Sequence, residues 1–454
     1  MRTAHYRSPT LERARRFLGK RAGFLPNRLV SGDLDGIRRV VVIPVLAEEE
    51  NLFKTLDSLG HNGAEELAQT LVICVVNNRA EPHAGPDQVA DNQRTLAHLD
   101  NLIHGRAASI QPSLEPDSLR LASVDASSPG REIGPKMGVG EGRRIGLDLG
   151  LSVLTENAED RGLLICLDAD TVVEADYLCE VQKHFVTRDS WAAVVGYAHT
   201  LPTEVQRRAA IVLYELFLRY HELGLRSARS PYAFPTIGST IAARCDAYVA
   251  AGGMNRRQAG EDFYFLQELA KTGGVGRVDS TTVHPSARSS DRVPFGTGAT
   301  VGRHLSGADD GTTVYHPESY KILGAWLSMV GSGLDRGASE LLGGAGGISP
   351  QLREFLELNR FEEIWPRLQQ NAAHHEGLES QFHRWFDAFK TLKLIHFLRD
   401  HQLSRCPIFD AIGELLARSE SSCSGVSWDD LADDIDAQEN LLELLRRQCA
   451  EDRF

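Results

Sequence analysis

The stretch "GLLICLDAD", residues 162–170, decides the fold. Its apolar run has the length of a buried strand, and Asp168 and Asp170 follow it directly. Helix-like segments lie on both sides, at 141–156 and 174–186. A continuous apolar run between two helices is typical of a strand in a parallel sheet that is covered on both faces. Such sheets bind their ligands at the carboxyl ends of the strands, where the two aspartates stand.

Five more runs of this kind extend the pattern. They are "RRVVVIPV" (38–45), "TLVICVVNN" (70–78), "LRLASVDA" (119–126), "WAAVVGYAH" (191–199) and "GRVDSTTVH" (276–284). Helical segments separate them, at 48–60, 204–223 and 261–272, with a long excursion at 79–118 that holds a helix near 90–103. Strands that alternate with helices predict an α/β fold, with a mainly parallel, Rossmann-like sheet flanked by helices.

The two ends of the chain differ from this middle part. Residues 1–28 hold eight Lys or Arg against the single acid Glu12, so we expect a basic N-terminal arm over 1–37. This arm would either lie on an anionic membrane or pack on the body as a solvated leader. A second domain follows at 38–305. We expect a helical C-terminal domain over 306–454, with helices near 350–372, 377–401, 408–418 and 428–448, the last capped by Ser427 with Asp430.

Composition narrows the classes of function. The 454 residues carry a net charge of -13, which gives no footprint for nucleic acid. An acidic enzyme for anionic substrates needs a cation or local arginines to offset its own field. The seven cysteines are scattered, without CxxC pairs, which favours a reducing cytoplasm. No run of about 18 apolar residues occurs.

Asp168 and Asp170 are the first candidate site. Both carboxylates can approach one cation, and Mg²⁺ or Mn²⁺ commonly takes one or two carboxylates and leaves places for water and substrate phosphate. Aspartates are also frequent in ordinary turns, but the position directly after "LLICL" favours a metal site. His284, at the end of the sixth run, could complete the shell of the ion, or be a hydrogen-bonded structural histidine.

Two further segments carry reactive side chains. In 252–274, Glu261 and Asp262 open an amphipathic helix, whose dipole favours ionised carboxylates that could accept a proton. The alternative is a routine acidic first turn. In 134–151, glycines accompany Lys136 and Arg143, a combination that suits phosphate. Neither G-x-G-x-x-G nor a P-loop is present there, which excludes those two nucleotide-binding classes.

These residues, in this order, resemble the family 2 glycosyltransferases, which are inverting enzymes of the GT-A fold that use nucleotide-activated sugars. "PVLAE" is similar to their opening P-x-Y-N-E, with Pro44 and Glu48 matching. The D-x-D matches Asp168 and Asp170, and the E-D pair matches Glu261 and Asp262. Their G-K-x-x-A-R-N region is similar in outline to 134–146, with Lys136 and Arg143 as counterparts. The resemblance covers about 38–300.

The resemblance implies a role for each matched residue. Pro44 and Glu48 would line the nucleotide pocket, and Asp262 would deprotonate the acceptor hydroxyl beside Glu261. Asp170 would bind the family's metal, Mn²⁺ or Mg²⁺, which bridges the donor diphosphate. Asp168 would face the ribose or the metal, and His284 is a further candidate ligand of the metal.

The sequence departs from the family at several positions. Asn77 and Asn78 stand where the family usually has Asp residues, one of which recognises a uracil, so the nucleotide stays open. Ala47 replaces the usual Asn of N-E. The spanning helices of the processive synthases are missing, which favours a single addition.

Three functions are compatible with these residues. The first is a metal-dependent, hexosyltransferase-like enzyme that moves one sugar from a nucleotide-sugar donor to an acceptor hydroxyl on a saccharide, a lipid-linked molecule or a small molecule. The second is a catalytically silent protein that binds nucleotide sugar as a regulator or partner subunit. The third, a sugar nucleotidyltransferase, should show a Gly-rich loop after the first strand, where this chain has "PVLAEEEN". The helical C-terminal domain would serve as a lid, an acceptor site or a contact with a second copy.

Overall fold

The computed structural model describes residues 8–21, 28–106, 119–257, 259–290, 296–309, 311–418, 428 and 431–451. The chain divides into two compact units. The sheet unit comprises Met1–Thr200 and Thr236–Ser286, and the helical unit comprises Leu201–Pro235 and Ala287–Phe454. The sequence boundary at residue 305 therefore differs from the division by contacts, which assigns 201–235 and 287–305 to the helical unit.

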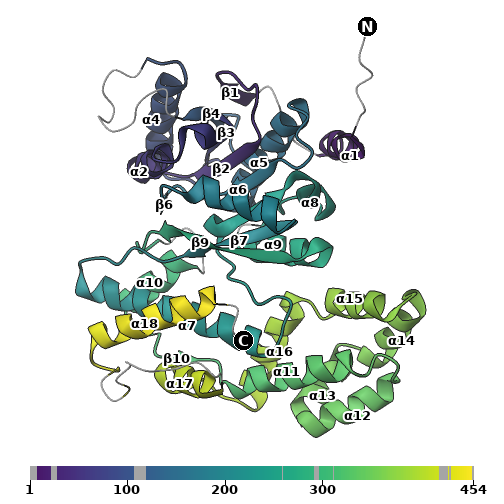
Figure 1. The fold of residues 1–454 in the computed structure, drawn as a ribbon. Coiled ribbons are helices and arrows are strands. Elements are labelled where there is room, and N and C mark those ends of the chain that lie inside the picture. The colour runs from purple at the N-terminus through teal and green to yellow at the C-terminus, as the bar shows by residue number, and fades with distance from the viewer. Residues whose placement is uncertain are drawn as a thin grey trace. The chain divides into compact units, whose positions relative to one another are not determined.

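A nine-stranded sheet forms the centre of the sheet unit (Figure 1). Its strand order is β1-β4-β3-β2-β5-β8-β7-β9-β6. All six predicted strands are present, and they all run in the same direction. The predicted class, an α/β fold with a mainly parallel sheet and a helical C-terminal part, is confirmed. The six strands are β2 (Arg39–Val45), β3 (Thr70–Asn77), β4 (Arg120–Ala126), β5 (Leu163–Cys166), β7 (Ala192–Tyr197) and β9 (Val275–Pro285).

Three short strands escaped the prediction. They are β1 (Leu29–Ser31), β6 (Thr171–Val173) and β8 (Ile241–Arg244), and each pairs antiparallel with its neighbours. With three or four residues, none is long enough to produce an apolar run that stands out from its surroundings. They are held in place by the longer strands beside them. Two of them matter for the site, because β6 follows the Asp168–Asp170 turn and β8 follows the 3₁₀ turn Gly238–Thr240.

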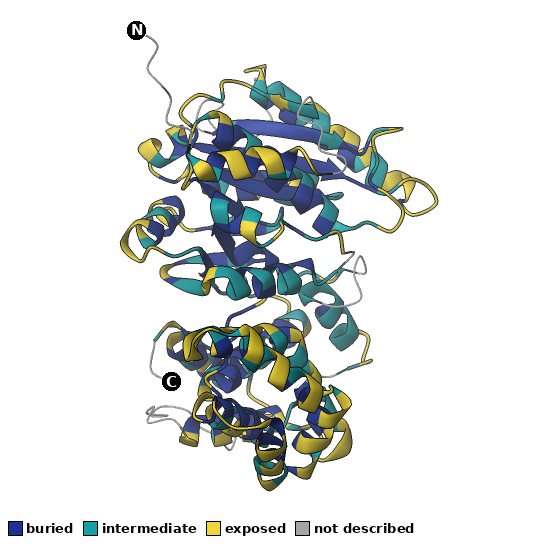
Figure 2. Cartoon of the chain, turned by 90° about the vertical axis from the view of Figure 1, so that its right-hand side faces the viewer, coloured by how far each residue is buried: buried dark blue, intermediate teal, exposed yellow. Residues whose placement is uncertain are grey.

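Helices cover the sheet, and its central strands are buried (Figure 2). Helix α5 packs on β2 and β3, while α4 contacts β4 and α6 contacts β9. Each of the helices predicted between the strands is present. The helices of the sheet unit are α1 (Pro9–Leu18), α2 (Glu49–Gly60), α3 (Ala64–Ala68), α4 (Pro86–Ile103), α5 (Val139–Glu156), α6 (Tyr177–Thr187), α8 (Cys245–Ala250) and α9 (Glu261–Gly273).

The direction of the strands places several of the predicted site residues along one edge of the sheet. Strands β2, β3, β5, β7 and β9 run the same way, so their carboxyl ends meet at the same edge. Four of these site residues are Glu48, which follows β2, Asn78, which follows β3, Asp168, which follows β5, and His284, which lies at the end of β9. This edge is where open α/β sheets bind ligands.

The helical unit has its own hydrophobic core. Trp326, Trp365, Phe361, Phe382 and Phe386 form an aromatic cluster at its centre. A two-stranded sheet joins β10 (Thr313–Val314) to β11 (Cys406–Pro407). The helices are α7 (Val205–Ser227), α10 (Thr297–Leu305), α11 (Glu318–Gly331), α12 (Ala338–Ile348), α13 (Pro350–Leu358), α14 (Phe361–Asn371), α15 (His375–Trp385), α16 (Ala388–His401), α17 (Ile408–Arg418) and α18 (Ile435–Ala450).

The last helix begins later than the sequence suggested. Asp434 caps α18 by accepting hydrogen bonds from the amides of Asp436 (2.9 Å) and Ala437 (3.3 Å). The predicted cap, Ser427 with Asp430, lies outside the described residues. The same holds for 1–7 and 22–27 of the N-terminal arm and for 107–118 of the long excursion.

The described part of the N-terminal arm is a packed helix. The apolar side of α1, with Leu11, Ala14 and Leu18, is buried against α5 and α8. An amphipathic helix needs that side to enter a membrane surface, whereas here protein covers it. Within the described residues, no helix combines the length and the apolar character that crossing a bilayer requires.

Candidate functional site

Arg143 is the centre of the site. Its guanidinium forms ion pairs with Asp168, which follows β5, and with Glu261, the first residue of α9. The side chains of Arg143 and Glu261 are 4% and 3% exposed, whereas that of Asp168 is 31% exposed. The structure thus brings together three segments that the sequence singled out separately. Sequence reasoning assigned Arg143 to phosphate, and its two ion pairs with these carboxylates were not foreseen.

Two glycines make room for this cluster. A Cβ on Gly238 would overlap the guanidinium of Arg143, which its two ion pairs hold in place, so the glycine leaves the space that the guanidinium occupies. A Cβ on Gly140, in the first turn of α5, would lie 2.9 Å from Cβ of Glu261. Helices α5 and α9 can therefore approach closely enough for Arg143 to reach across. Gly238 was missed in the sequence because nothing near it in the chain indicates an arginine 95 residues away.

Burial and charge act on the cluster together. Burial lowers the pKa of Arg143, but the carboxylates of Asp168 and Glu261 outweigh it and leave the pKa above its ordinary value. Burial raises the pKa of Glu261, and Arg143 opposes that rise. Burial also raises the pKa of Asp262, against Arg143 and the hydrogen bond that the Phe263 amide donates to its carboxylate at 2.7 Å. Asp262 is thus a carboxylate with increased proton affinity in the first turn of a helix.

The turn that carries Asp168 and Asp170 is fixed by backbone contacts. The carbonyl of Ala169 accepts a hydrogen bond from Thr55 Oγ1 at 3.0 Å, and that of Asp170 accepts one from the Ser286 amide at 3.1 Å. Both aspartates are partly exposed. Two carboxylates at a ligand edge, joined by phosphate oxygens and water, fit the oxygen chemistry of Mg²⁺ or Mn²⁺. The described residues contain no cluster of three or more His, Cys, Asp or Glu that could hold a metal by itself.

His284 is engaged at both ring nitrogens. Its Nδ1 lies 3.0 Å from the carbonyl oxygen of Ala198, and its Nε2 lies 2.7 Å from Oε1 of Glu174. To ligate a metal, the ring would have to exchange one of these partners. Its place is set by β9, in which it is opposite Val172 of β6. Glu174, which sequence reasoning missed, follows β6 and gave no signal of its own.

Asn77 and Asn78 are buried and belong to a polar network. Asn77 Nδ2 donates to the carbonyls of Val45 (3.1 Å) and Val75 (3.0 Å), which uses both of its hydrogens. Asn78 Nδ2 donates to the Arg79 carbonyl, and its Oδ1 accepts from Asn92 at 3.0 Å. Asn77 can therefore meet a ligand only through its side-chain oxygen, which accepts hydrogen bonds.

Asn92, on α4, ties this network to the loop after β2. It is fully buried, and its Oδ1 accepts a hydrogen bond from the Ala47 amide at 2.8 Å. Ala47 has a φ of +50°, a left-handed conformation that Asn and Gly adopt more readily than Ala. The hydrogen bond from its amide to Asn92 holds Ala47 in this conformation, although alanine adopts it less readily. Asn92 was missed in the sequence because its partners are far away in the chain.

The remaining predicted residues differ in exposure. Pro44 is buried in β2, and Glu48 is 6% exposed and accepts a hydrogen bond from Asn51 Nδ2 at 2.9 Å. Pro44 and Asn77 both lie against α5, because a Cβ on Gly142 would be 3.2 Å from Cβ of Pro44 and 2.8 Å from Nδ2 of Asn77. Lys136 is exposed in the loop before α5.

The sequence matches no protein-family model and no curated protein. Among solved structures, it is similar to S. aureus TarS in complex with UDP-GlcNAc, at 12% identity and a TM-score of 0.38, over 73% of this chain and 90% of that one. It is also similar to a mannosyltransferase from Pyrobaculum calidifontis in complex with GDP-Man and Mn²⁺, at 13% identity and 0.34, over 82% and 93%. A third is M. tuberculosis glucosyl-3-phosphoglycerate synthase, at 14% identity and 0.32, over 65% and 89%.

Proposed function

We propose that the chain is a glycosyltransferase of the GT-A fold that moves one sugar from a nucleotide-sugar donor to an acceptor hydroxyl. The observation that carries this proposal is the pairing of one buried arginine, Arg143, with Asp168 of the D-x-D turn and Glu261 of the E-D pair. Arg143 thereby joins Asp168, on the donor side, to the start of α9, which holds the proposed base Asp262. The order of the motifs along the chain supports the same function.

The donor side lies at the ends of β2, β3 and β5. Asp168 and Asp170 would hold Mn²⁺ or Mg²⁺, which when bound neutralises the charge that develops on the leaving diphosphate. Lys136, exposed in the loop before α5, is available to a phosphate. Pro44 and Glu48 would line the nucleotide pocket, and the oxygen of Asn77 can accept a hydrogen bond from an N–H group of a base.

The acceptor side lies at the start of α9. Asp262 would take the proton of the attacking hydroxyl, because it sits in the first turn of a helix and its pKa is raised. Glu261 beside it is held by Arg143 and keeps that arginine in place. Direct attack by the acceptor inverts the sugar, with a single addition per cycle. The acceptor hydroxyl would belong to a saccharide, a lipid-linked molecule or a small molecule.

A screen of donor hydrolysis tests this function. Purified protein is incubated with a panel of nucleotide sugars and Mn²⁺, and release of nucleoside diphosphate is measured. We expect slow, metal-dependent release by the wild type and its loss in Asp170→Ala. With an acceptor present, Asp262→Ala should lower transfer by about 10²- to 10⁴-fold. Asp100→Ala, an exposed aspartate on α4, is the control and should match the wild type.

The departures from the family pattern at Ala47, Asn77 and Asn78 support a second function, that of a catalytically silent protein that binds nucleotide sugar. Binding of a donor without turnover, with every acceptor tested, would favour this second function and contradict the first.

A further inference from the structure

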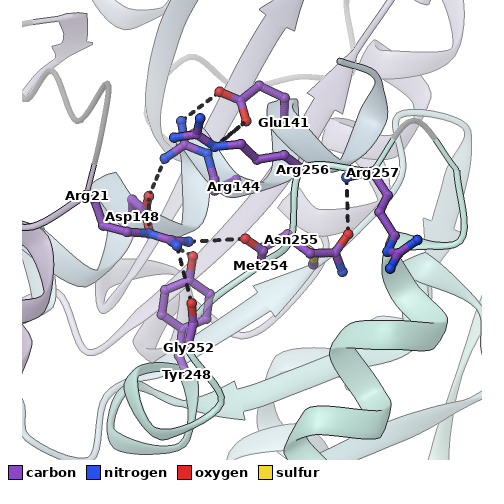
Figure 3. Close-up of polar contacts among 10 residues, drawn as sticks. All are labelled: Arg21, Glu141, Arg144, Asp148, Tyr248, Gly252, Met254, Asn255, Arg256 and Arg257. Carbon is purple, nitrogen blue, oxygen red and sulfur yellow. Dashed lines mark hydrogen bonds and ion pairs between the residues drawn. The ribbon is translucent and has the colours of Figure 1, made fainter. Parts of the chain in front are cut away.

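Arg21, which follows helix α1, binds a loop of the sheet unit that is far away in the chain (Figure 3). Its Nη1 donates to the carbonyl of Gly252 at 3.2 Å, and its Nη2 donates to the carbonyl of Met254 at 3.1 Å. Its Nε lies 3.2 Å from Oδ2 of Asp148, on α5. One guanidinium thus joins the N-terminal helix, helix α5 and the loop 252–257.

Asp148 anchors this arrangement. The carboxylate is 2% exposed, and it also accepts hydrogen bonds from Arg144 Nη1 and the Tyr248 hydroxyl, both at 2.8 Å. The guanidinium of Arg21 stacks over the ring of Phe17 at 4.8 Å from its centroid. Arg21 is therefore held in one position by a buried charge and by an aromatic ring.

The loop leads directly to the proposed base. Asn255 follows Met254, and its Nδ2 donates to the carbonyl of Glu261 at 2.9 Å. On its other side the loop lies against α5, because a Cβ on Gly140 would be 2.7 Å from the Arg257 carbonyl oxygen. A path of contacts therefore runs from Arg21 through Met254 and Asn255 to the backbone of Glu261, one residue before Asp262.

Gly253 shows how closely the arginine approaches. Its φ is +75°, and a Cβ there would lie 2.5 Å from Nη2 of Arg21. The neighbouring Gly252 has a similar φ, +79°, but a Cβ on it would meet nothing within 4 Å. The two glycines share the backbone conformation, but an added Cβ would meet Arg21 and the Phe17 ring only at Gly253, which makes them a matched pair for an experiment.

We propose that Arg21 is a positioning residue that holds the loop 252–257, and through it Asp262, in the geometry for proton transfer. This inference rests on the proposed function for the role of Asp262. In this role the basic N-terminal arm contributes to catalysis through Arg21. Misplacement of a catalytic group by about 1 Å can cost 10²-fold in rate, so a loss of this order is expected when the arginine is removed.

The fold should survive the removal of Arg21. Asp148 keeps Arg144 and Tyr248 as partners, so no buried charge is left alone. Arg21→Met removes the charge and all donors. Arg21→Lys keeps the charge, but a single ammonium cannot reproduce the planar fork that reaches two carbonyls and a carboxylate. Arg16→Met, which removes an exposed charge from helix α1 itself, is the control.

The first measurement is hydrogen exchange of the backbone amides, which does not depend on activity. In Arg21→Met we expect faster exchange confined to about residues 252–262, an intermediate effect in Arg21→Lys and none in Arg16→Met. In steady-state kinetics, kcat should fall by about 10- to 100-fold, with KM for the donor unchanged, because the donor-side residues lie elsewhere. Gly253→Ala should show the same pattern more strongly than Gly252→Ala.

The outcomes separate the two proposals. Unchanged exchange at 252–262, or faster exchange spread over the whole sheet unit, overturns the role of Arg21 whatever the activity. Local exchange with an unchanged kcat also overturns it. If the wild type turns over no donor, the proposed function fails, and local exchange in Arg21→Met still establishes that Arg21 holds the loop.

Discussion

At the scale of single residues, the site depends on one buried cation between carboxylates. Asp168, Glu261 and Asp262 repel one another, and burial makes that repulsion stronger than it is in water. Arg143 favours the ionised forms of Glu261 and Asp262 and draws Asp168 and Glu261 to itself. It therefore stabilises the arrangement of the site before any ligand binds.

Arg143→Met should destabilise the protein strongly, because it leaves Glu261 buried without its cation. The breaking of a buried ion pair from one side costs about 3–5 kcal/mol, and the partial exposure of Asp168 places the expected loss near the lower figure, about 3 kcal/mol. Urea unfolding measures this loss. Arg94→Met, which breaks an exposed pair with Glu49, is the control and should change the free energy of unfolding much less. An equal effect of the two variants would contradict the central role of Arg143.

The raised pKa of Asp262 predicts the pH dependence of activity. A base works only when it is ionised, and a raised pKa means that ionisation is lost at a higher pH than usual. The acid limb of the kcat/KM profile should therefore lie above the ordinary Asp pKa of about 3.9. Circular dichroism at each pH shows that the protein stays folded. An acid limb at or below about pH 4 would rule out Asp262 as the base.

The residues of the candidate site could be proposed from the sequence, but the contacts among them could not. Asp168 stood out because it follows an apolar run, and Asp262 stood out because it lies in the first turn of an amphipathic helix. Gly238, Asn92 and Glu174 act through partners that are distant in the chain, and no local pattern indicates such contacts. Arg143, Asp168 and Glu261 were each proposed from the sequence, while the two ion pairs that join them emerged only in the fold.

At the scale of elements, the glycines of α5 set its distance from the sheet. The sequence suggested that glycines in this region admit a ligand. In the structure, Gly146 and Gly150 face strands instead. A Cβ on Gly146 would lie 2.2 Å from Cγ1 of Val42, and one on Gly150 would lie 2.8 Å from Cγ1 of Val40. The close packing of α5 is what brings Arg143, at its start, to the carboxyl edge of the sheet.

Gly146→Ala should lower the stability of the sheet unit by about 1–3 kcal/mol, because the added methyl group meets a rigid β-branched side chain. Gly343→Ala is the control, since it lies within α12 with nothing within 4 Å of an added Cβ. There the higher helix propensity of Ala should stabilise by up to about 1 kcal/mol. Differential scanning calorimetry distinguishes the two directions. A neutral or stabilising Gly146→Ala would contradict the packing role.

Elements were predictable where they were long. The six strands and the helices between them follow from hydrophobic runs and periodicity, whereas β1, β6 and β8 are too short to produce such a signal. Predicted helices 350–372 and 377–401 are each split in two, into α13 and α14 and into α15 and α16. Pattern reasoning detects the helical character of such a stretch better than the turn within it.

At the scale of the whole molecule, each of the two units has a core of its own. The sheet unit holds every residue predicted for the site, and the helical unit is built around an aromatic cluster. The chain passes from the sheet unit into the helical unit twice, since 201–235 belongs to the latter and 236–286 to the former. The sequence could not indicate that the chain enters the helical unit twice, because the pattern of α7 is that of a helix between two strands.

The central claim is that a nucleoside diphosphate binds at the carboxyl edge of the sheet together with a divalent cation held by Asp168 and Asp170. Isothermal titration calorimetry with UDP and GDP tests it most directly, with Mn²⁺ or with EDTA. Wild type and Asp100→Ala should bind one of them saturably only with Mn²⁺, and Asp170→Asn should lose that binding. Equal binding in EDTA, or unchanged binding by Asp170→Asn, would contradict the claim.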